Sequence, residues 1–282
     1  MENSKEFGKA FKSYSKINIF LKILSKRRDG FHNIFSYILP LNFYDEIYFE
    51  EIEKGNFDVQ TYNVDIKKEE NLVFKAGMKL LKYARNKRGV RIKIFKNIPL
   101  GSGLGGGSSN CATTIKFLNG FWECNLSQKE ILKIATELGS DVPFFIKGRP
   151  ALVSGKGEKI SFRKINLKIP QSIVLFIPQI SVPTKDVYLA FDKINRKIPK
   201  FNKIDYLKNL NFDNLKNDLQ ESAFFIFPEL KSIYNKIKET NPEVLLLSGS
   251  GSAFWGFYKD NQIQEKAKRS LTNFVKFYIV SI

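Results

Sequence analysis

The segment Pro99 to Asn110, with the sequence Pro-Leu-Gly-Ser-Gly-Leu-Gly-Gly-Gly-Ser-Ser-Asn, constrains the fold of this chain more than any other. Five glycines and three serines fall within its last ten residues. Glycine adopts positive φ values and lets backbone N–H groups approach a ligand closely. Residues 111–119 are predicted to form a helix, whose unpaired N–H groups and positive dipole end would face this loop. A glycine loop that opens into a helix favours a binding site for a polyphosphate.

Two common nucleotide-binding patterns help little in classifying this loop. Residues 101–106 satisfy G-x-G-x-x-G, but a match to so short a pattern has low specificity, and here it follows Ile98-Pro99. The P-loop pattern requires Lys-Ser or Lys-Thr after the glycines, and neither pair follows them here. The alternatives are a flexible linker or a plain helix-entry loop. A linker of this composition is not typical between a strand and a well-formed helix.

Composition is that of a globular protein, since 43% of the 282 residues are hydrophobic. The formal net charge of +18 is consistent with binding to nucleic acid or a membrane surface, or with attraction of an anionic substrate. Lysine greatly outnumbers arginine, and the basic runs 26–28 and 85–88 are short and separate. We therefore expect no nucleic-acid partner, and we interpret the charge mainly as a composition bias spread over the surface.

The cysteine content and the hydropathy pattern predict a cytoplasmic protein. Cys111 and Cys124 have neither the spacing of a metal site nor the number needed for a disulfide framework, so we expect reduced thiols. Residues 1–7 contain no apolar signal region, and no apolar run approaches the ~18–20 residues that span a bilayer. We expect no membrane partner.

The alternation of residues 15–24 predicts a strand with Lys16 and Asn18 side by side on the face opposite Ile17 and Ile19. Ser127 and Glu130 form a capping-box pattern before a helix that ends at Gly139. Further strands are predicted at 33–41, 45–52, 90–95, 172–178, 244–247, 253–258 and 274–280. Further helices are predicted at 72–84 (capped by Asn71), 217–227, 228–240 and 262–270, with 191–212 loosely helical. This mixture indicates an α+β fold rather than a doubly wound sheet.

Three polar residues, Lys16, Asn18 and Asp141, could support phosphoryl transfer next to the glycine loop. Asp141 could accept the proton of an alcohol, and Lys16 could keep Asp141 ionised and neutralise charge on the moving phosphoryl group. Each residue also has a structural alternative. Lys16 could be a solvated lysine, Asp141 could cap a short helix before Pro143, and Asn18 could pair with a backbone group. His32, the only histidine, could lie exposed in a turn without a role.

Taken in order, five segments of the chain resemble the galactokinase, homoserine, mevalonate and phosphomevalonate (GHMP) kinase superfamily. They are residues 15–21 (Ser-Lys-Ile-Asn-Ile-Phe-Leu), 28–32 (Arg-Asp-Gly-Phe-His), 103–109 (Gly-Leu-Gly-Gly-Gly-Ser-Ser), 138–145 (Leu-Gly-Ser-Asp-Val-Pro-Phe-Phe) and 248–253 (Ser-Gly-Ser-Gly-Ser-Ala). The glycine segments are shared across the superfamily. The second and fourth segments narrow the resemblance to the members that phosphorylate 4-diphosphocytidyl-2-C-methyl-D-erythritol.

The resemblance implies a two-domain α+β fold with the substrate in a cleft between the domains. A nucleotide-binding domain would span residues 1–158 and a second domain residues 159–282. The implied reaction is ATP-dependent phosphorylation of a hydroxyl of the cytidine-diphosphate substrate, in the non-mevalonate route to isoprenoid precursors. The partners are this substrate and ATP, with Mg²⁺ whose ligands are unassigned. The expected assembly is a monomer or a weak homodimer.

The resemblance also implies roles for individual residues. Asp141 matches the catalytic base and Lys16 its partner. The ATP-binding positions are Pro99, Gly101, Ser102, Gly103, Leu104, Gly105, Gly106, Gly107, Ser108, Ser109, Asn71 and Leu72. The substrate-binding positions are Asn18, Phe31, His32, Asp141, Thr184 and Tyr188, with the aromatic rings around the cytosine.

Two positions depart from the family pattern. Asn110 stands where Asp is usual, and Phe31 replaces a common Tyr. Two other functions stay open: a sister kinase that acts on mevalonate or homoserine, and a nucleic-acid-binding protein on a kinase-like fold. Phe31, His32 and Tyr188 argue against the first because mevalonate and homoserine carry no base to stack. Lys16 and Asp141 argue against the second.

Overall fold

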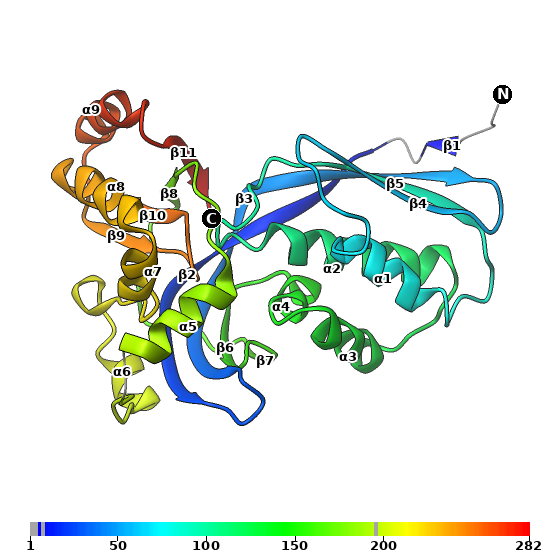
Figure 1. Cartoon of the computed structure of the whole chain (residues 1–282), viewed down its shortest axis with the longest axis horizontal. Coiled ribbons are helices and arrows are strands. Elements are labelled where there is room, and N and C mark those ends of the chain that lie inside the picture. The colour runs from blue at the N-terminus through cyan, green and yellow to red at the C-terminus, as the bar shows by residue number, and fades with distance from the viewer. Residues whose placement is uncertain (1–4, 7–8, 195–196) are drawn as a thin grey trace. The chain divides into compact units, whose positions relative to one another are not determined.

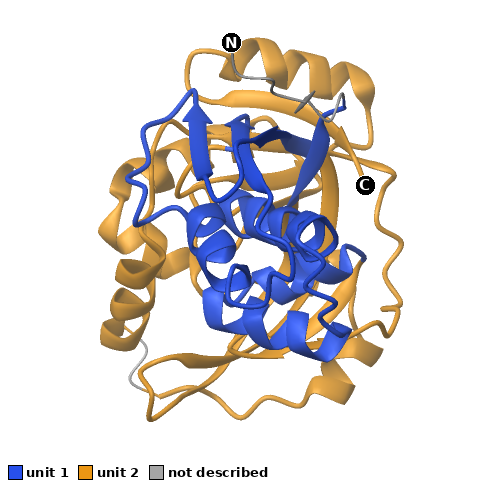
Figure 2. Ribbon diagram, turned by 90° about the vertical axis from the view of Figure 1, so that its right-hand side faces the viewer, with its two compact units in different colours: residues 1–15, 43–98, 105–149 blue, residues 16–42, 99–104, 150–282 orange. Residues whose placement is uncertain are grey.

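The computed structural model describes residues 5–6, 9–194 and 197–282, and the chain separates into two compact units (Figure 2). Unit 1 consists of Met1–Ser15, Phe43–Ile98 and Gly105–Arg149, and unit 2 of Lys16–Asn42, Pro99–Leu104 and Pro150–Ile282. Both units are therefore assembled from several segments of the chain. The domain boundary at residue 158 stays a prediction, and the predicted absence of a signal concerns residues 1–7, most of which lie outside the described residues.

Unit 1 is a layer of strands with helices on one face (Figure 1). The C-terminal half of β3 (His32–Ile52) pairs antiparallel with β5 (Gly89–Phe95), and β4 (Phe57–Tyr62) pairs parallel with β5. The short strand β1 (Lys5–Glu6) also pairs with β3. The next strand in the sequence is β2 (Phe11–Lys26). The helices are α1 (Leu72–Leu80), α2 (Gly106–Phe121), α3 (Gln128–Leu138) and α4 (Val142–Lys147).

Unit 2 contains the remaining parts of β2 and β3 together with a separate four-stranded sheet. The N-terminal half of β3 pairs antiparallel with β6 (Ala151–Gly155), which pairs with β7 (Lys159–Ser161). The other sheet is antiparallel in the order β11 (Lys276–Ser281), β8 (Ser172–Ile177), β10 (Phe254–Phe257) and β9 (Val244–Leu247). Its helices are α5 (Thr184–Ile194), α6 (Lys203–Lys208), α7 (Gln220–Ile226), α8 (Pro228–Glu239) and α9 (Asn261–Leu271), with a 3-10 turn, η1 (Phe212–Asn214).

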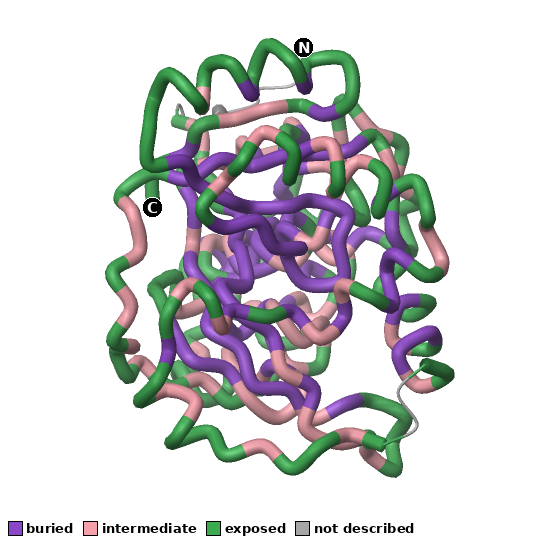
Figure 3. Tube along the Cα trace, turned by 90° about the vertical axis from the view of Figure 1, so that its left-hand side faces the viewer, coloured by how far each residue is buried: buried purple, intermediate pink, exposed green. Residues whose placement is uncertain are grey.

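The core of unit 2 forms where these helices cover the four-stranded sheet. Phe176 and Phe254 on the sheet pack with Leu230 and Ile237 of α8 and with Val187 of α5. Burial of such side chains stabilises the fold by about 1.5–3 kcal/mol each. Figure 3 shows buried residues along the strands and exposed residues in the loops and on the outer turns of helices.

Several predicted elements are confirmed, and the α+β class with them, since helices stand beside two sheets whose strand pairs described above are antiparallel, apart from β4 with β5. Asn71 Oδ1 accepts from Val73 N at the start of α1. Ser127 and Glu130 form both bonds of the capping box, and α3 ends at Gly139. No helix among the described residues is long and apolar enough to cross a membrane.

Other predictions about secondary structure were wrong. The strands expected at 33–41 and 45–52 are one strand, β3, which pairs with β6 over residues 34–38, with β5 over residues 46–52, and also with β2. Helix α2 begins at Gly106 instead of residue 111, and α7 begins at Gln220 instead of residue 217. Strand β4 and most of α5 were not predicted. The loosely helical segment 191–212 contains the end of α5 and all of α6, and its residues 195–196 lie outside the described residues.

Candidate active site

The glycine loop has the backbone conformation that its composition predicts. Gly101, Gly103 and Gly105 all have positive φ. Gly103 requires glycine for a second reason, since a β-carbon there would lie 2.0 Å from Ser248 O. Gly105 is the N-cap of α2, and no described side chain caps that helix. A helix end without a capping side chain is suited to meet an anion.

A second glycine segment, residues 248–252, packs directly on this loop within unit 2. Ser252 N donates to Gly101 O at 3.1 Å, and Ala253 N donates to Ser102 O at 3.0 Å. The Ser248 hydroxyl donates to Gly103 O at 3.1 Å. These contacts tie together two segments about 150 residues apart, and they hold the loop from the side of its carbonyl groups.

Lys16 and Asn18 lie side by side, as the alternation of β2 predicts. Lys16 Nζ donates to Asn18 Oδ1 at 2.7 Å and to Gly103 O at 2.8 Å. Asn18 Nδ2 in turn donates to the Ser36 hydroxyl at 2.8 Å. Only 4% of Lys16 is exposed, so the interpretation as a solvated lysine was wrong. A buried ammonium is costly unless it is hydrogen-bonded, and here an amide oxygen and a loop carbonyl supply those bonds.

Asp141 lies at the start of α4 but does not act as its side-chain cap. The residue occupies the N-cap position, yet its carboxylate makes no capping hydrogen bond, so the capping alternative was wrong. Gly139, two residues earlier, is close to the first turn of α2: a β-carbon built on it would lie 3.8 Å from Ser108 Oγ. Unit 1 therefore brings the segment before Asp141 next to Ser108.

Asn71 and Leu72 also lie near the first turn of α2. Leu72 Cδ1 would be 3.9 Å from a β-carbon on Gly107. Besides capping α1, Asn71 donates to the Thr61 hydroxyl at 3.1 Å. Both residues belong to unit 1, where α1 packs against α2. The structure thus gathers Asn71, Leu72, Gly107 and Ser108 in one region.

His32 is buried and not exposed in a turn: only 4% of the residue is accessible. Its Nε2 lies 2.7 Å from Asp192 Oδ1, and because a carboxylate only accepts, Nε2–H donates. The ring stacks on Tyr188 with centroids 5.0 Å apart and an interplanar angle of 29°. Rings at this separation are in direct contact, so no base fits between them. A base on Tyr188 would have to use another part of that ring.

Asp192 was not identified from the sequence, because only the folded chain brings it to His32, 160 positions away. It also pairs with Lys26 at 2.7 Å. Partial burial raises the pKa of Asp192, but the hydrogen bonds from Lys26 and His32 outweigh it and hold the pKa below its ordinary value of 3.8. Asp192 thus stays ionised and fixes the orientation of the His32 ring.

The two other expected substrate residues occupy different surroundings in unit 2. Phe31 is 51% exposed, with Lys156 Nζ 4.9 Å from its ring centroid. Thr184, at the start of α5, has its hydroxyl 2.9 Å from that of Ser250. Thr184 therefore joins α5, which carries Tyr188, to the second glycine segment.

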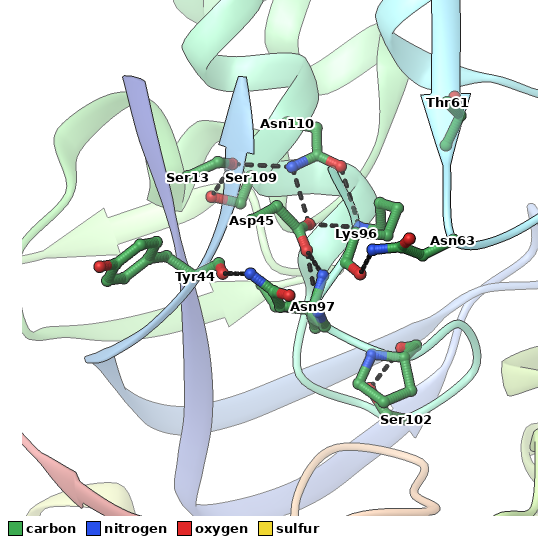
Figure 4. A network of polar contacts seen from close by, with 12 residues as sticks. Ser13, Tyr44, Asp45, Thr61, Asn63, Lys96, Asn97, Ser102, Ser109 and Asn110 are labelled. Atoms are coloured by element: carbon green, nitrogen blue, oxygen red, sulfur yellow. Dashed lines mark hydrogen bonds and ion pairs between the residues drawn. The ribbon is translucent and has the colours of Figure 1, made fainter. Parts of the chain in front are cut away.

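Asn110 belongs to a buried polar network in unit 1 that the sequence did not reveal (Figure 4). Its amide nitrogen donates to the Ser13 hydroxyl and to Asp45 Oδ2, both at 2.9 Å, and its oxygen accepts from Lys96 Nζ at 3.0 Å. Lys96 also pairs with Asp45. Burial lowers the pKa of Lys96, although Asp45 opposes this. Asn110 uses both ends of its amide here, so it is a structural part of this network.

The thiols and the acidic side chains show no metal or disulfide chemistry in the described part of the chain. Cys111 and Cys124 are buried and form no disulfide. Burial raises the pKa of both thiols. No three His, Cys, Asp or Glu side chains among the described residues form a group that could hold a metal ion.

Comparison with known proteins identifies the family. Residues 71–149 match the model of the GHMP kinases N terminal domain. A 4-diphosphocytidyl-2-C-methyl-D-erythritol kinase of Thermodesulfovibrio yellowstonii is 36% identical over 268 residues, which cover 91% of this chain and 92% of the relative. The enzyme of the same name from Clostridioides difficile is 34% identical and covers 96% of this chain and 94% of its own.

Solved structures agree with this assignment. A crystal structure of 4-(cytidine 5'-diphospho)-2C-methyl-D-erythritol kinase aligns with a TM-score of 0.79 and 28% identity, over 97% of this chain and all of the other. A homoserine kinase from Cytophaga hutchinsonii aligns with a TM-score of 0.64 at 16% identity, which shows the shared fold alone. This chain has the GHMP kinase fold and belongs to the 4-diphosphocytidyl-2-C-methyl-D-erythritol kinase family.

Proposed function

We propose that this protein transfers the γ-phosphoryl group of ATP to a hydroxyl of 4-diphosphocytidyl-2-C-methyl-D-erythritol, in the non-mevalonate route to isoprenoid precursors. The observation that carries the proposal is the buried Lys16 ammonium, which donates to Gly103 O in the glycine loop. A cation held next to a phosphate-binding loop stabilises the charge that develops in phosphoryl transfer. Family membership supplies the substrate.

ATP binds, in this proposal, with its phosphates at residues 99–109 and its adenine near Asn71 and Leu72. The uncapped start of α2 at Gly105 and Gly106 supports the phosphate position. Leu72 lies against Gly107, which supports an adenine site at the same end of the helix. Mg²⁺ enters with the nucleotide, because Mg²⁺ is commonly held by substrate phosphates with one or two carboxylates. When bound with the nucleotide, it would supply positive charge next to the phosphates.

Asp141 acts as the general base for the attacking hydroxyl. Its carboxylate is not used as a helix cap, so it can accept a proton without weakening α4. As the O–P bond forms and the bond to ADP breaks, the proton of the alcohol passes to Asp141. Lys16 neutralises the phosphoryl oxygens, and Asn18 holds Lys16 through its 2.7 Å bond. Catalysis of this class is mostly positioning and electrostatic stabilisation.

The cytidine group binds at Tyr188, His32 and Phe31. His32 supports Tyr188 from one side, and the base stacks on the part of the Tyr188 ring that does not face His32. Thr184 contacts the substrate from the start of α5. A kinase of mevalonate or homoserine would have no use for this aromatic group, since neither substrate carries a base.

The test is ADP release from MgATP with 4-diphosphocytidyl-2-C-methyl-D-erythritol, beside mevalonate and homoserine. Turnover with the cytidine compound alone supports the proposal. Turnover with mevalonate or homoserine would keep the phosphoryl chemistry and overturn the base site. Salt-dependent binding to DNA without any turnover would instead favour a nucleic-acid-binding protein.

A further inference from the structure

Asn217 is a buried side chain that ties the second glycine segment to the rest of unit 2. Its Nδ2 donates to Leu247 O at 2.8 Å and to Gly249 O at 2.7 Å. Its Oδ1 accepts from Leu219 N at 3.0 Å. Only 7% of the residue is exposed. All of these bonds are to backbone, so Asn217 uses its whole amide group to hold main chain in place.

The backbone around Asn217 is in turn fixed to the strand that carries Lys16. Leu21 N donates to Lys216 O at 3.0 Å, and Asp218 N donates to Leu21 O at 2.8 Å. These bonds form a parallel bridge between Leu21 and Asn217. Because Leu21 lies on β2 five residues after Lys16, one rigid connection links β2 to the second glycine segment.

Gly249, the residue that Asn217 holds, lies against Lys16. A β-carbon on Gly249 would be 3.3 Å from Lys16 Nζ and 3.4 Å from both Asn18 Oδ1 and Gly103 O. Ser248, its neighbour, shares the acceptor Gly103 O with Lys16. The position of Gly249 therefore limits where the Lys16 ammonium can lie relative to the glycine loop.

We propose that Asn217 is a positioning residue for phosphoryl transfer, which holds Gly249 so that Lys16 stays aligned on Gly103. This inference rests on the proposed function for the role of Lys16. The hydrogen bonds of the Asn217 side chain go to Leu219, Leu247 and Gly249. Its effect passes through the backbone of residues 247–249. A misplacement of about 1 Å can cost on the order of 100-fold in rate.

Gln220 offers a matched control on the same connection. Its Oε1 accepts from Leu247 N at 3.0 Å, so Gln220→Ala also removes a bond to the end of β9. Its bond goes to Leu247 and not to Gly249. Asn217→Asp keeps the acceptor for Leu219 N but replaces the Nδ2 donor by an oxygen that faces two carbonyl groups. Asn217→Ser removes the reach to both carbonyls without adding a charge.

The experiment compares kcat and KM of the three variants with those of the unchanged protein, after thermal unfolding has shown that each variant folds. We expect both Asn217 variants to lose about tenfold or more in kcat, with the KM for the cytidine substrate changed less than about twofold, which is the pattern of a lost transition-state interaction. Gln220→Ala should keep kcat within about twofold. Equal kcat values in all three variants, or failure of both Asn217 variants to fold while Gln220→Ala folds, would overturn the proposal.

Hydrogen exchange gives a readout that does not depend on turnover. The amides of Lys16, Ser252 and Ala253 donate to loop carbonyls, and they should exchange faster in the Asn217 variants than in Gln220→Ala. If the unchanged protein phosphorylates none of the alcohols, the proposed function fails, and the exchange pattern still decides whether Asn217 holds this region. Unchanged protection in the Asn217 variants would overturn the inference.

Discussion

The ammonium of Lys16 donates a 2.8 Å hydrogen bond to the carbonyl oxygen of Gly103. The residue that we assign to charge stabilisation is thus joined directly to the loop that we expect to hold the phosphates of ATP. Lys16 N also donates to Leu104 O at 2.9 Å. Both the backbone and the side chain of Lys16 are therefore hydrogen-bonded to this loop. These two bonds fix the orientation of Lys16 toward the loop, as preorganised electrostatic catalysis requires.

Replacement of Lys16 should lower the catalytic rate far more than the affinity for the nucleotide. We expect Lys16→Met to lower kcat by roughly 10²–10³-fold, which is typical of the loss of one preorganised donor. Lys12→Met is the control, because Lys12 lies on the same strand and is exposed. Steady-state kinetics with saturating MgATP measure both variants. Similar kcat values for the two would remove Lys16 from the mechanism.

Asp141→Asn should keep the fold and ATP binding while it removes the proton acceptor. General acid–base catalysis contributes about 10²–10⁴-fold, and we expect a loss of kcat in this range. Because the carboxylate makes no capping bond in α4, the change should leave that helix intact, and circular dichroism should show an unchanged helix content. Calorimetry with ATP provides the binding control. Normal turnover in this variant would show that another group accepts the proton.

Tyr188→Ala should weaken binding of the cytidine substrate and leave binding of ATP unchanged. Stacking on an aromatic ring contributes about 1–3 kcal/mol per base, which predicts a KM for the cytidine substrate raised by about 5- to 150-fold. Tyr188→Phe keeps the ring and its contact with His32, so its KM should stay close to that of the unchanged protein. If Tyr188→Ala raised the KM for ATP equally, the defect would lie in folding and not in the base site.

The Asp192 carboxylate should make part of the free energy of unfolding depend on pH. Its pKa is held below 3.8 in the folded protein, whereas the unfolded chain titrates near that ordinary value. The contribution is therefore fully present above pH 3.8 and is lost as the pH falls through the lower, folded pKa. Urea unfolding at pH 7 and at successively lower pH should show the unchanged protein losing its advantage over Asp192→Asn. A constant difference between the two proteins would contradict this assignment.

Local patterns in the sequence predicted the parts of the site that depend on neighbouring residues. The alternation of β2 placed Lys16 beside Asn18, and the spacing of Ser127 and Glu130 gave the capping box. Both results follow from fixed periods of strand and helix, in which near neighbours decide the geometry. Family resemblance, not spacing, supplied the roles of Phe31, His32 and Tyr188.

Long-range pairing decided what the sequence could not show. Asp192 and His32 meet only after folding. Asn217 was placed in a helix because the two carbonyl groups that accept from its side-chain nitrogen lie 30 and 32 residues away. Strand β3 continues through its expected break at 42–44, and it pairs with β2 as well as with β5 and β6. In each case a tertiary contact overrides a local preference.

Asn110 provides the last prediction, because a change to the residue usual in the family should not help this chain. Asn110→Asp removes the donors to Ser13 and Asp45 and sets a second carboxylate oxygen where the amide lay 2.9 Å from Asp45 Oδ2. Lys96 offsets part of this repulsion, but a buried acceptor left without a donor costs about 1–3 kcal/mol. We expect the free energy of unfolding at neutral pH to fall by about 1–3 kcal/mol.

The control for this change is Asn97→Asp. Asn97 is exposed, and its side chain also loses one donated bond, to Tyr44 O. Water can replace that bond, so its unfolding free energy should change by less than about 0.5 kcal/mol. Urea denaturation of both variants measures the difference. A more stable Asn110→Asp protein would mean that Lys96 is under-neutralised in this network, and that the asparagine was kept for a reason other than the stability of unit 1.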